Sequence, residues 1–244
     1  MRPSLIALLL TLPLSADGLA SLKTNLAKLN GGDAVKATVD YGFWRQTTED
    51  KKPVQTQGKV TVNVEDGPLG LRLGWGKQVL QQAAQESRAQ AKDPEKTTGT
   101  RSALRAVDAI EAAELLNYAE PLLRSLEGAQ LLEEKTDTWQ GQPAHLLILK
   151  VEAKMPASQK KYIKKLDVQA KVWVGGDGLP LAASVNMAYT ASRFFISFEG
   201  SQKEERRFQK TGNRLVVAST QSEDSNSGFG QSTSSKKTTT VSLN

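Results

Sequence analysis

The chain has 244 residues, a net charge of +6 and no cysteine. Without cysteine it can form no disulfide and carry no lipid anchor on an N-terminal cysteine, so a packed core must stabilise the fold. The mildly basic charge favours anionic surfaces or acidic partners in general. Neither a basic helix nor a basic strand studded with aromatic residues accompanies it, so we expect no nucleic-acid binding.

The first sixteen residues have the layout of a secretory signal peptide. Arg2 is followed by an apolar run over residues 5–14 and by the small residues Ser15 and Ala16. This is the usual order of a charged region, an apolar region and a cleavage site, so we expect cleavage after Ala16. The alternative is an uncleaved anchor, but the run has about ten residues where a membrane-spanning helix needs about 20.

We expect residues 17–244 to form one soluble, monomeric domain in the periplasm. Removing residues 1–16 removes one positive charge, that of Arg2, and leaves a net charge of +5. The remainder is long enough for a single large β-rich domain with a sizeable core. No other stretch of the sequence approaches the length of a membrane-spanning helix.

A short amphipathic helix and three strands open this domain. Residues 18–30 carry four leucines at helical spacing and end at a Gly-Gly pair, which predicts a helix. Residues 35–43, 60–64 and 69–75 alternate apolar and polar side chains and are separated by turn residues. They predict three antiparallel strands whose shared apolar face needs a cover.

Residues 77–126 are expected to supply that cover. Residues 78–92 are rich in Gln and Ala, and residues 101–126 form a strong helical segment that we expect Pro121 to break in two. The charged stretch over residues 93–100 predicts an exposed loop between them. The sequence allows two interpretations of these helices: they form a lid over a cavity, or they pack permanently on the sheet.

The second half of the chain, from Ala129, again has strand-like alternation. Residues 144–153 are apolar on both faces, which predicts a central strand covered on both sides. Residues 168–174 and 181–189 flank a Gly-rich turn and predict a hairpin, which residues 194–198 and 215–217 continue. The polar tail from Ser219 is either an edge strand or partly disordered, and the β-branched run over residues 238–241 favours the edge strand.

The order of strands, helices and strands predicts an α+β protein with a curved antiparallel sheet, or half-barrel, whose concave apolar face is covered by helices. This order of elements, together with the hairpin sequence over residues 171–181 (KVWVGGDGLPL), resembles the pattern of the bacterial outer-membrane lipoprotein carrier (LolA-like) superfamily. The resemblance implies a periplasmic half-barrel closed by helices over a hydrophobic cavity that takes acyl chains or other lipids.

We therefore expect a non-catalytic binder or carrier of a lipid, a lipoprotein acyl chain or another hydrophobic ligand. The alternative is a protein-interaction or envelope-stress sensor module on the same fold. The cavity between sheet and helices should be lined by apolar residues of the early strands, the helices and the central hairpin: Val60, Val62, Leu69, Leu71, Leu73, Trp75, Leu104, Val107, Ile110, Val172, Val185 and Met187.

Residues with catalytic chemistry are scarce. His145 is the only histidine and cysteine is absent, so metal sites and Ser/His or Cys/His catalysis have little support. The glutamates at 133/134 and 204/205 are neighbours on expected strands, so their carboxylates should point to opposite faces. The glutamates at 111/114 lie on the polar face of an expected helix and should be solvated. No glycine motif has phosphate-binding spacing. We expect no enzyme and no cofactor, and a hydrolase is the third alternative.

Lysines gather around the connection before residue 166. Lys160, Lys161, Lys164 and Lys165 surround Tyr162 and Ile163. One interpretation is a solubilising loop, because charge runs are usually solvated. The other is docking to an anionic membrane surface or an acidic envelope protein, worth up to about 1 kcal/mol per lysine at an anionic bilayer.

Overall fold

The computed structural model describes residues 17–49, 52–152, 157–193 and 196–244. The expected signal peptide lies outside these ranges. The described residues form an α+β fold with one open, curved antiparallel sheet. Its strands are β1 (Val35–Glu49), β2 (Lys52–Gly67), β3 (Gly70–Trp75), β4 (Gln130–Trp139), β5 (Gln142–Lys150), β6 (Ile163–Val174), β7 (Pro180–Arg193), β8 (Ile196–Thr211), β9 (Arg214–Gly228) and β10 (Gln231–Leu243).

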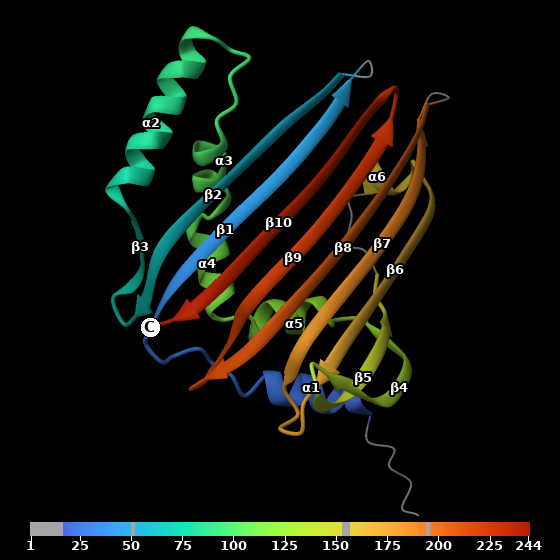
Figure 1. Ribbon diagram of the computed structural model, residues 1–244. Helices are drawn as coiled ribbons and strands as arrows, with labels where there is room; N and C mark the ends of the chain where they lie inside the picture. Colours follow the sequence, from blue (N-terminus) through green and yellow to red (C-terminus); the bar gives the residue numbers. More distant parts are fainter. Residues whose placement is uncertain (1–16, 50–51, 153–156, 194–195) are drawn as a thin grey trace, which may run out of the picture.

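The sheet has the spatial order β3-β2-β1-β10-β9-β8-β7-β6-β5-β4, seen as the row of long arrows in Figure 1. Its last strand in sequence is therefore central: β10 pairs with β1 from Ala37 opposite Leu243 to Glu49 opposite Gln231. The prediction of an edge strand in the tail was wrong. Pairing with β1 satisfies the backbone groups of both strands, which an edge would leave free, and joins the two halves of the chain.

The two faces of the sheet differ. Residues directly opposite each other in neighbouring strands point to the same side, so Val39, Val62 and Val241 share one face and all are buried. We call this side the helix face and the other side the open face. Helices α3, α4 and α5 lie behind the sheet in Figure 1, against the helix face.

The helices of the described chain are α1 (Gly18–Leu26), α2 (Lys77–Lys92), α3 (Gly99–Ala106), α4 (Ala109–Leu116), α5 (Ala119–Ser125) and α6 (Ala157–Lys160). Within the described residues, none of them is long and apolar enough to cross a membrane. α3 approaches β2 so closely that a Cβ on Gly58 would overlap the backbone of Gly99. Of α2, only Ala83 is buried, so this helix contributes little to the core.

The expected break at Pro121 is wrong, because residues 101–126 contain two other breaks. Asp108 ends the first stretch and caps α4, its side chain accepting from the N–H groups of Ile110 and Glu111 at 2.9 Å each. Asn117 and Tyr118 separate α4 from α5. Pro121 lies in the first turn of α5, where a helix does not use the backbone N–H and tolerates proline.

One continuous core lies between the helix face and α1, α3, α4 and α5. Its largest fully buried members are Leu22, Leu26, Leu116, Leu147, Leu149 and Leu215. β5 lies next to the edge strand β4 and is therefore not central as predicted, but it has buried side chains on both faces, as the sequence indicated. Leu147 and Leu149 face the core, while Leu146 is buried on the open face, opposite Trp173, which packs against Trp139 at 4.5 Å.

Candidate functional site

The expected cavity-lining residues lie in three settings. Val60, Val62, Val107 and Val172 are buried in the core. Others are partly buried and pack against it: Leu71, Leu73, Trp75, Leu104 and Val185. Leu69, in the turn between β2 and β3, and Ile110, on α4, are 86% and 73% exposed, and Met187 is half-buried on β7. Most of these residues therefore meet, but in a packed helix–sheet interface.

An apolar strip continues this core beyond the helices. It consists of Leu166, Val168, Met187, Tyr189 and Phe198, on the helix face of β6, β7 and β8. Leu166 lies opposite Tyr189 and Val168 opposite Met187, while Val185, two positions before Met187, packs against the core. Behind the upper ends of these strands Figure 1 shows, among the described elements, only the short α6. Leu166 and Phe198 accordingly remain 36% and 37% exposed.

Two aromatic rings lie close to the sheet along this strip. The ring of Tyr189 covers Gly200 of β8, and the ring of Phe198 covers Gly228 of β9; a Cβ on either glycine would overlap the ring. The Tyr189 hydroxyl donates to Asn226 Oδ1 at 2.9 Å, which holds its ring in this position. Glycine opposite an aromatic residue thus leaves a shallow apolar surface that an extended ligand could contact.

Of the residues in this strip, only Met187 was among the cavity-lining residues expected from the sequence. Alternation in residues 168–174 and 181–189 did indicate which side chains share a face. It could not indicate where along each strand the helices stop, because that depends on how far α3, α4 and α5 reach over the sheet. A half-exposed position and a buried one have the same pattern in sequence.

Positive charge lies at the end of the apolar strip. Lys160, Lys161, Lys164 and Lys165 are all exposed. The backbone N–H of Ser192, near the end of β7, donates to the carbonyl of Tyr162 at 2.9 Å and fixes this segment beside the strip. Lys161 Nζ and Arg193 Cζ lie 5.0 Å and 5.1 Å from the centre of the Tyr162 ring, within the range of cation–π attraction.

A polar cluster borders the core on the helix face. It comprises Tyr118, which begins the α5 region, with Glu204, Arg206 and Phe208 of β8 and Glu111 of α4. Arg206 donates to the Tyr118 hydroxyl, lies 4.7 Å from its ring centre and pairs with Glu204 at 2.8 Å. Tyr118 also stacks on Phe208 at 5.6 Å. These contacts tie α5 to β8 where the packed core ends.

The surroundings of this cluster shift the pKa values of Tyr118 and Glu111. Burial raises the pKa of Tyr118 to about 12, against the lowering influence of Arg206. Burial also raises the pKa of Glu111, and Arg206 again opposes the shift. Glu111 is an exposed residue, as its helical position predicted, but the protein around its carboxylate still raises its pKa. Both shifts favour the neutral form, as burial does for any acid.

The residues considered for catalytic or metal chemistry, His145 and the paired glutamates, lie on β5, α4, β4 and β8. No group of three or more histidine and acidic side chains is placed there to hold a metal ion. His145 is exposed and lies opposite Thr136 in the ladder of β4 and β5. Glu204 lies opposite Val185 and Glu205 opposite Ser184, so the two carboxylates point to different faces, as predicted.

Comparisons with known proteins give a remote structural likeness. No family model matches the chain, and no curated protein does. Among solved structures, a DUF1329 family protein from Desulfovibrio piger is similar over 91% of this chain and 90% of its own, with 10% sequence identity and a TM-score of 0.24. A likeness at this level carries no argument about fold or function.

Proposed function

We propose that the protein binds and carries a lipid or another ligand with an acyl chain outside the cytoplasm, without catalysing a reaction. The apolar strip is the observation that carries this proposal. It exposes apolar side chains beside a core that is already buried, and covering them gains about 25 cal/mol per Å² of apolar surface. Its residues are contiguous, which is typical of a binding surface rather than of scattered exposed side chains.

The charge at the end of the strip favours an amphipathic ligand with an anionic head group. Lys161 and Arg193 lie around Tyr162, which is bound to β7 next to Ala191 and Ser192. A chain lying along Met187 and Tyr189 would bring a carboxylate or phosphate to these cations. Hydrogen bonds between charged partners are about twice as strong as neutral ones.

The packed core is a less favourable place for the ligand. A chain that reached Val62, Val107 or Val172 would have to separate α3 and α4 from the sheet, because these side chains are already in contact with protein atoms. It would also disturb the bond between Tyr118 and Arg206. The strip requires neither movement, so we place the acyl chain there.

Extraction and titration test the proposal together. Organic extraction of the purified mature chain, followed by mass spectrometry, should release lipid. In a titration with a dansylated fatty acid, Leu166→Glu and Met187→Glu should each weaken binding about tenfold or more, since each places a charge in the apolar contact. Leu80→Glu is the matched control, because Leu80 is exposed on α2, away from the strip.

The proposal is contradicted if Leu166→Glu and Met187→Glu bind the dansylated fatty acid as tightly as the wild type does, or if the wild type does not bind it. Stoichiometric capture of one protein partner without lipid would favour the alternative of an interaction or sensor module. Circular dichroism of each variant separates a lost contact from a lost fold. Both substituted strip positions are at least partly accessible, so we expect native spectra.

Export is the second part of the proposal. Asp17 is the N-cap of α1, its side chain accepting from the N–H groups of Leu19 and Ala20 at 3.1 Å and 3.3 Å. Cleavage after Ala16 would leave this cap in place, so the mature helix keeps its stabilising start. N-terminal sequencing of protein from the periplasmic fraction should begin at Asp17, and an intact Met1 there would contradict export by cleavage.

A further inference from the structure

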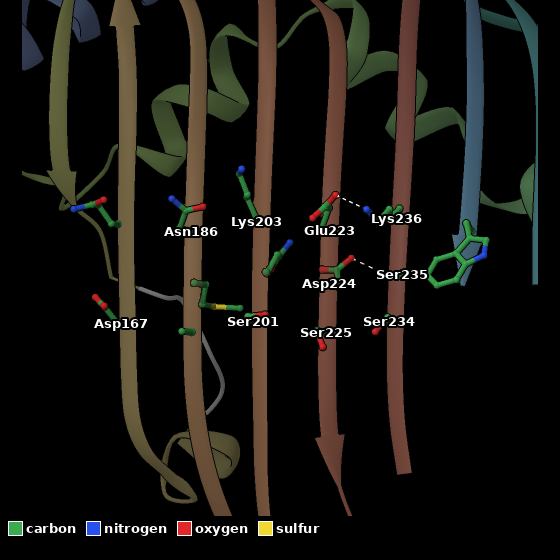
Figure 2. A pocket seen from close by; sticks show the side chains of 15 residues that line it. Asp167, Asn186, Ser201, Lys203, Glu223, Asp224, Ser225, Ser234, Ser235 and Lys236 are labelled. Atoms are coloured by element: carbon green, nitrogen blue, oxygen red, sulfur yellow. Dashed lines mark hydrogen bonds and ion pairs between the residues drawn. The ribbon is translucent and has the colours of Figure 1, made fainter. Parts of the chain in front are cut away.

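The open face carries a shallow hollow with a volume of about 540 Å³. Its lining comes from six neighbouring strands, β6, β7, β8, β9, β10 and β1, and Figure 2 shows most of these side chains standing on adjacent strands of the sheet. At about 4.8 Å per strand, the hollow extends about 24 Å across the sheet. In Figure 1 this face is towards the viewer, and no described helix crosses it.

Strand register arranges the lining in two rows that run across the strands. The first row has longer side chains, which form a wall: Gln169, Asn186, Lys203, Glu223, Lys236 and Trp44. The second row has mostly short side chains, which form the floor: Asp167, Ala188, Ser201, Ser225 and Ser234. The result is a trough perpendicular to the strands.

The charges of this trough nearly balance. Lys236 pairs with Glu223 at 2.8 Å, and Lys203 lies opposite Glu223 on the other side. With Asp167, the two rows hold two ammonium groups and two carboxylates, and Asp224, bonded to Ser235, adds a third carboxylate to the lining. A polyanion such as a nucleic acid or an acidic glycan gains little from such a surface. Hydroxyl, amide and carboxylate groups instead offer donors and acceptors suited to a ligand rich in hydroxyl groups.

Trp44 gives the trough an aromatic surface and joins it to a second hollow. This second hollow, of about 890 Å³, lies between α2 and the edge of the sheet, and it shares Trp44 and Lys236 with the first. Gln57, Gln78 and Gln82 add further amides there. A third hollow, of about 350 Å³, shares Asp167, Ser201 and Ser225. The three form one extended groove.

We propose that this groove binds a neutral linear oligosaccharide, with Trp44 contacting the apolar face of one sugar ring and the amides and hydroxyls bonding its hydroxyl groups. A rigid aromatic ring offers contact area at little entropic cost, which suits a ligand with few apolar groups of its own. The groove length suits a chain of several sugars, and its nearly balanced charge suits a neutral one. Most of the lining side chains stand on the open face, opposite the apolar strip, although Met187 and Tyr189 of the strip also border the first and third hollows.

Calorimetric titration of the mature chain with chitohexaose, cellohexaose and maltohexaose tests the proposal, with a heparin hexasaccharide as the charged comparison. At least one neutral hexasaccharide should bind. Trp44→Ala and Ser225→Arg should each weaken that binding about tenfold or more, by removing the aromatic contact or filling the floor. Ser225 is exposed, so its substitution leaves the core intact.

Trp139→Ala is the matched control, because Trp139 packs against Trp173 on the same face but outside the groove. It should leave the sugar affinity within about twofold of the wild type, and none of the variants should change fatty-acid uptake. The proposal is overturned if no neutral hexasaccharide binds, if only the heparin hexasaccharide binds, or if Trp139→Ala weakens binding as much as Trp44→Ala does.

Discussion

Arg214, the first residue of β9, forms an ion pair with Asp66 of β2 at 2.8 Å, although its side chain is only 3% exposed. Its Nε also donates to the carbonyl oxygen of Asp33 at 2.6 Å. The guanidinium therefore binds the segment before β1 and the end of β2 to the C-terminal half of the chain. Removing one partner of a buried pair leaves the other charge without compensation.

Arg214→Ala should lower the free energy of unfolding by about 3–5 kcal/mol, because it leaves Asp66 and the carbonyl of Asp33 without their partner. Lys36→Ala is the control, since Lys36 pairs with the neighbouring Glu65 at 2.9 Å but both side chains are largely exposed; it should cost at most about 1 kcal/mol. Urea unfolding of both variants provides the comparison. Equal losses would show that burial does not strengthen the Arg214 pair.

Val172→Glu should unfold the protein, with a loss of about 4 kcal/mol or more in the free energy of unfolding, because Val172 is buried among the apolar side chains of the core and the new carboxylate would lose its hydration there. Val54→Glu makes the same change at an exposed position of β2 and should leave the fold intact. Circular dichroism and thermal unfolding measure both. A folded Val172→Glu variant that no longer takes up the fatty-acid probe would place the ligand in the core instead of on the strip.

Reversing the lysine cluster tests whether it docks on membranes. The variant with Lys160, Lys161, Lys164 and Lys165 changed to Glu should no longer co-sediment with anionic vesicles at low salt, while its melting temperature stays close to that of the wild type. The control changes four exposed lysines elsewhere to Glu: Lys77, Lys92, Lys96 and Lys210. If both variants lose co-sedimentation with the vesicles to the same extent, the net charge of the protein and not a docking patch causes the binding.

Glu111→Gln should stabilise the protein at neutral pH. Burial raises the folded-state pKa of Glu111 above its ordinary value of 4.5, so the folded state holds the proton more tightly than the unfolded state. Stability is then lost as pH rises through the folded pKa. The Gln side chain does not ionise, so the variant avoids this loss of stability. Its stability advantage over the wild type should disappear below pH 4.5, where Glu111 is protonated in both states.

Melting temperatures at neutral pH and at about pH 4 test this dependence. Glu95→Gln, in the exposed loop after α2, is the control and should change the melting temperature little at either pH. If Glu111→Gln destabilises the protein at neutral pH, the carboxylate contributes more through Arg206 than it loses by burial.

The elements and their faces were largely predictable. Alternation in residues 60–64 and 168–174 correctly placed Val60, Val62 and Val172 on one apolar face, because a strand turns successive side chains to opposite sides. Helix breaks were less predictable. Pro121 looked like the stronger signal, yet the chain breaks before Asp108, whose side chain caps α4 by accepting from free N–H groups. Pro121 lies in the first turn of α5, where the N–H that proline lacks has no partner within the helix.

Sequence by itself determined the strand and helix types, the apolar face of each strand and the shortage of catalytic groups, because these depend on local spacing and residue chemistry. Only the tertiary structure decided that β10 pairs with β1, that Leu166 and Phe198 remain partly exposed, and that Trp44 aligns with Lys236 and Glu223 across the open face. These relationships join residues far apart in the chain, and they depend on how side chains pack across the whole sheet, because every strand offers the same backbone hydrogen-bonding groups.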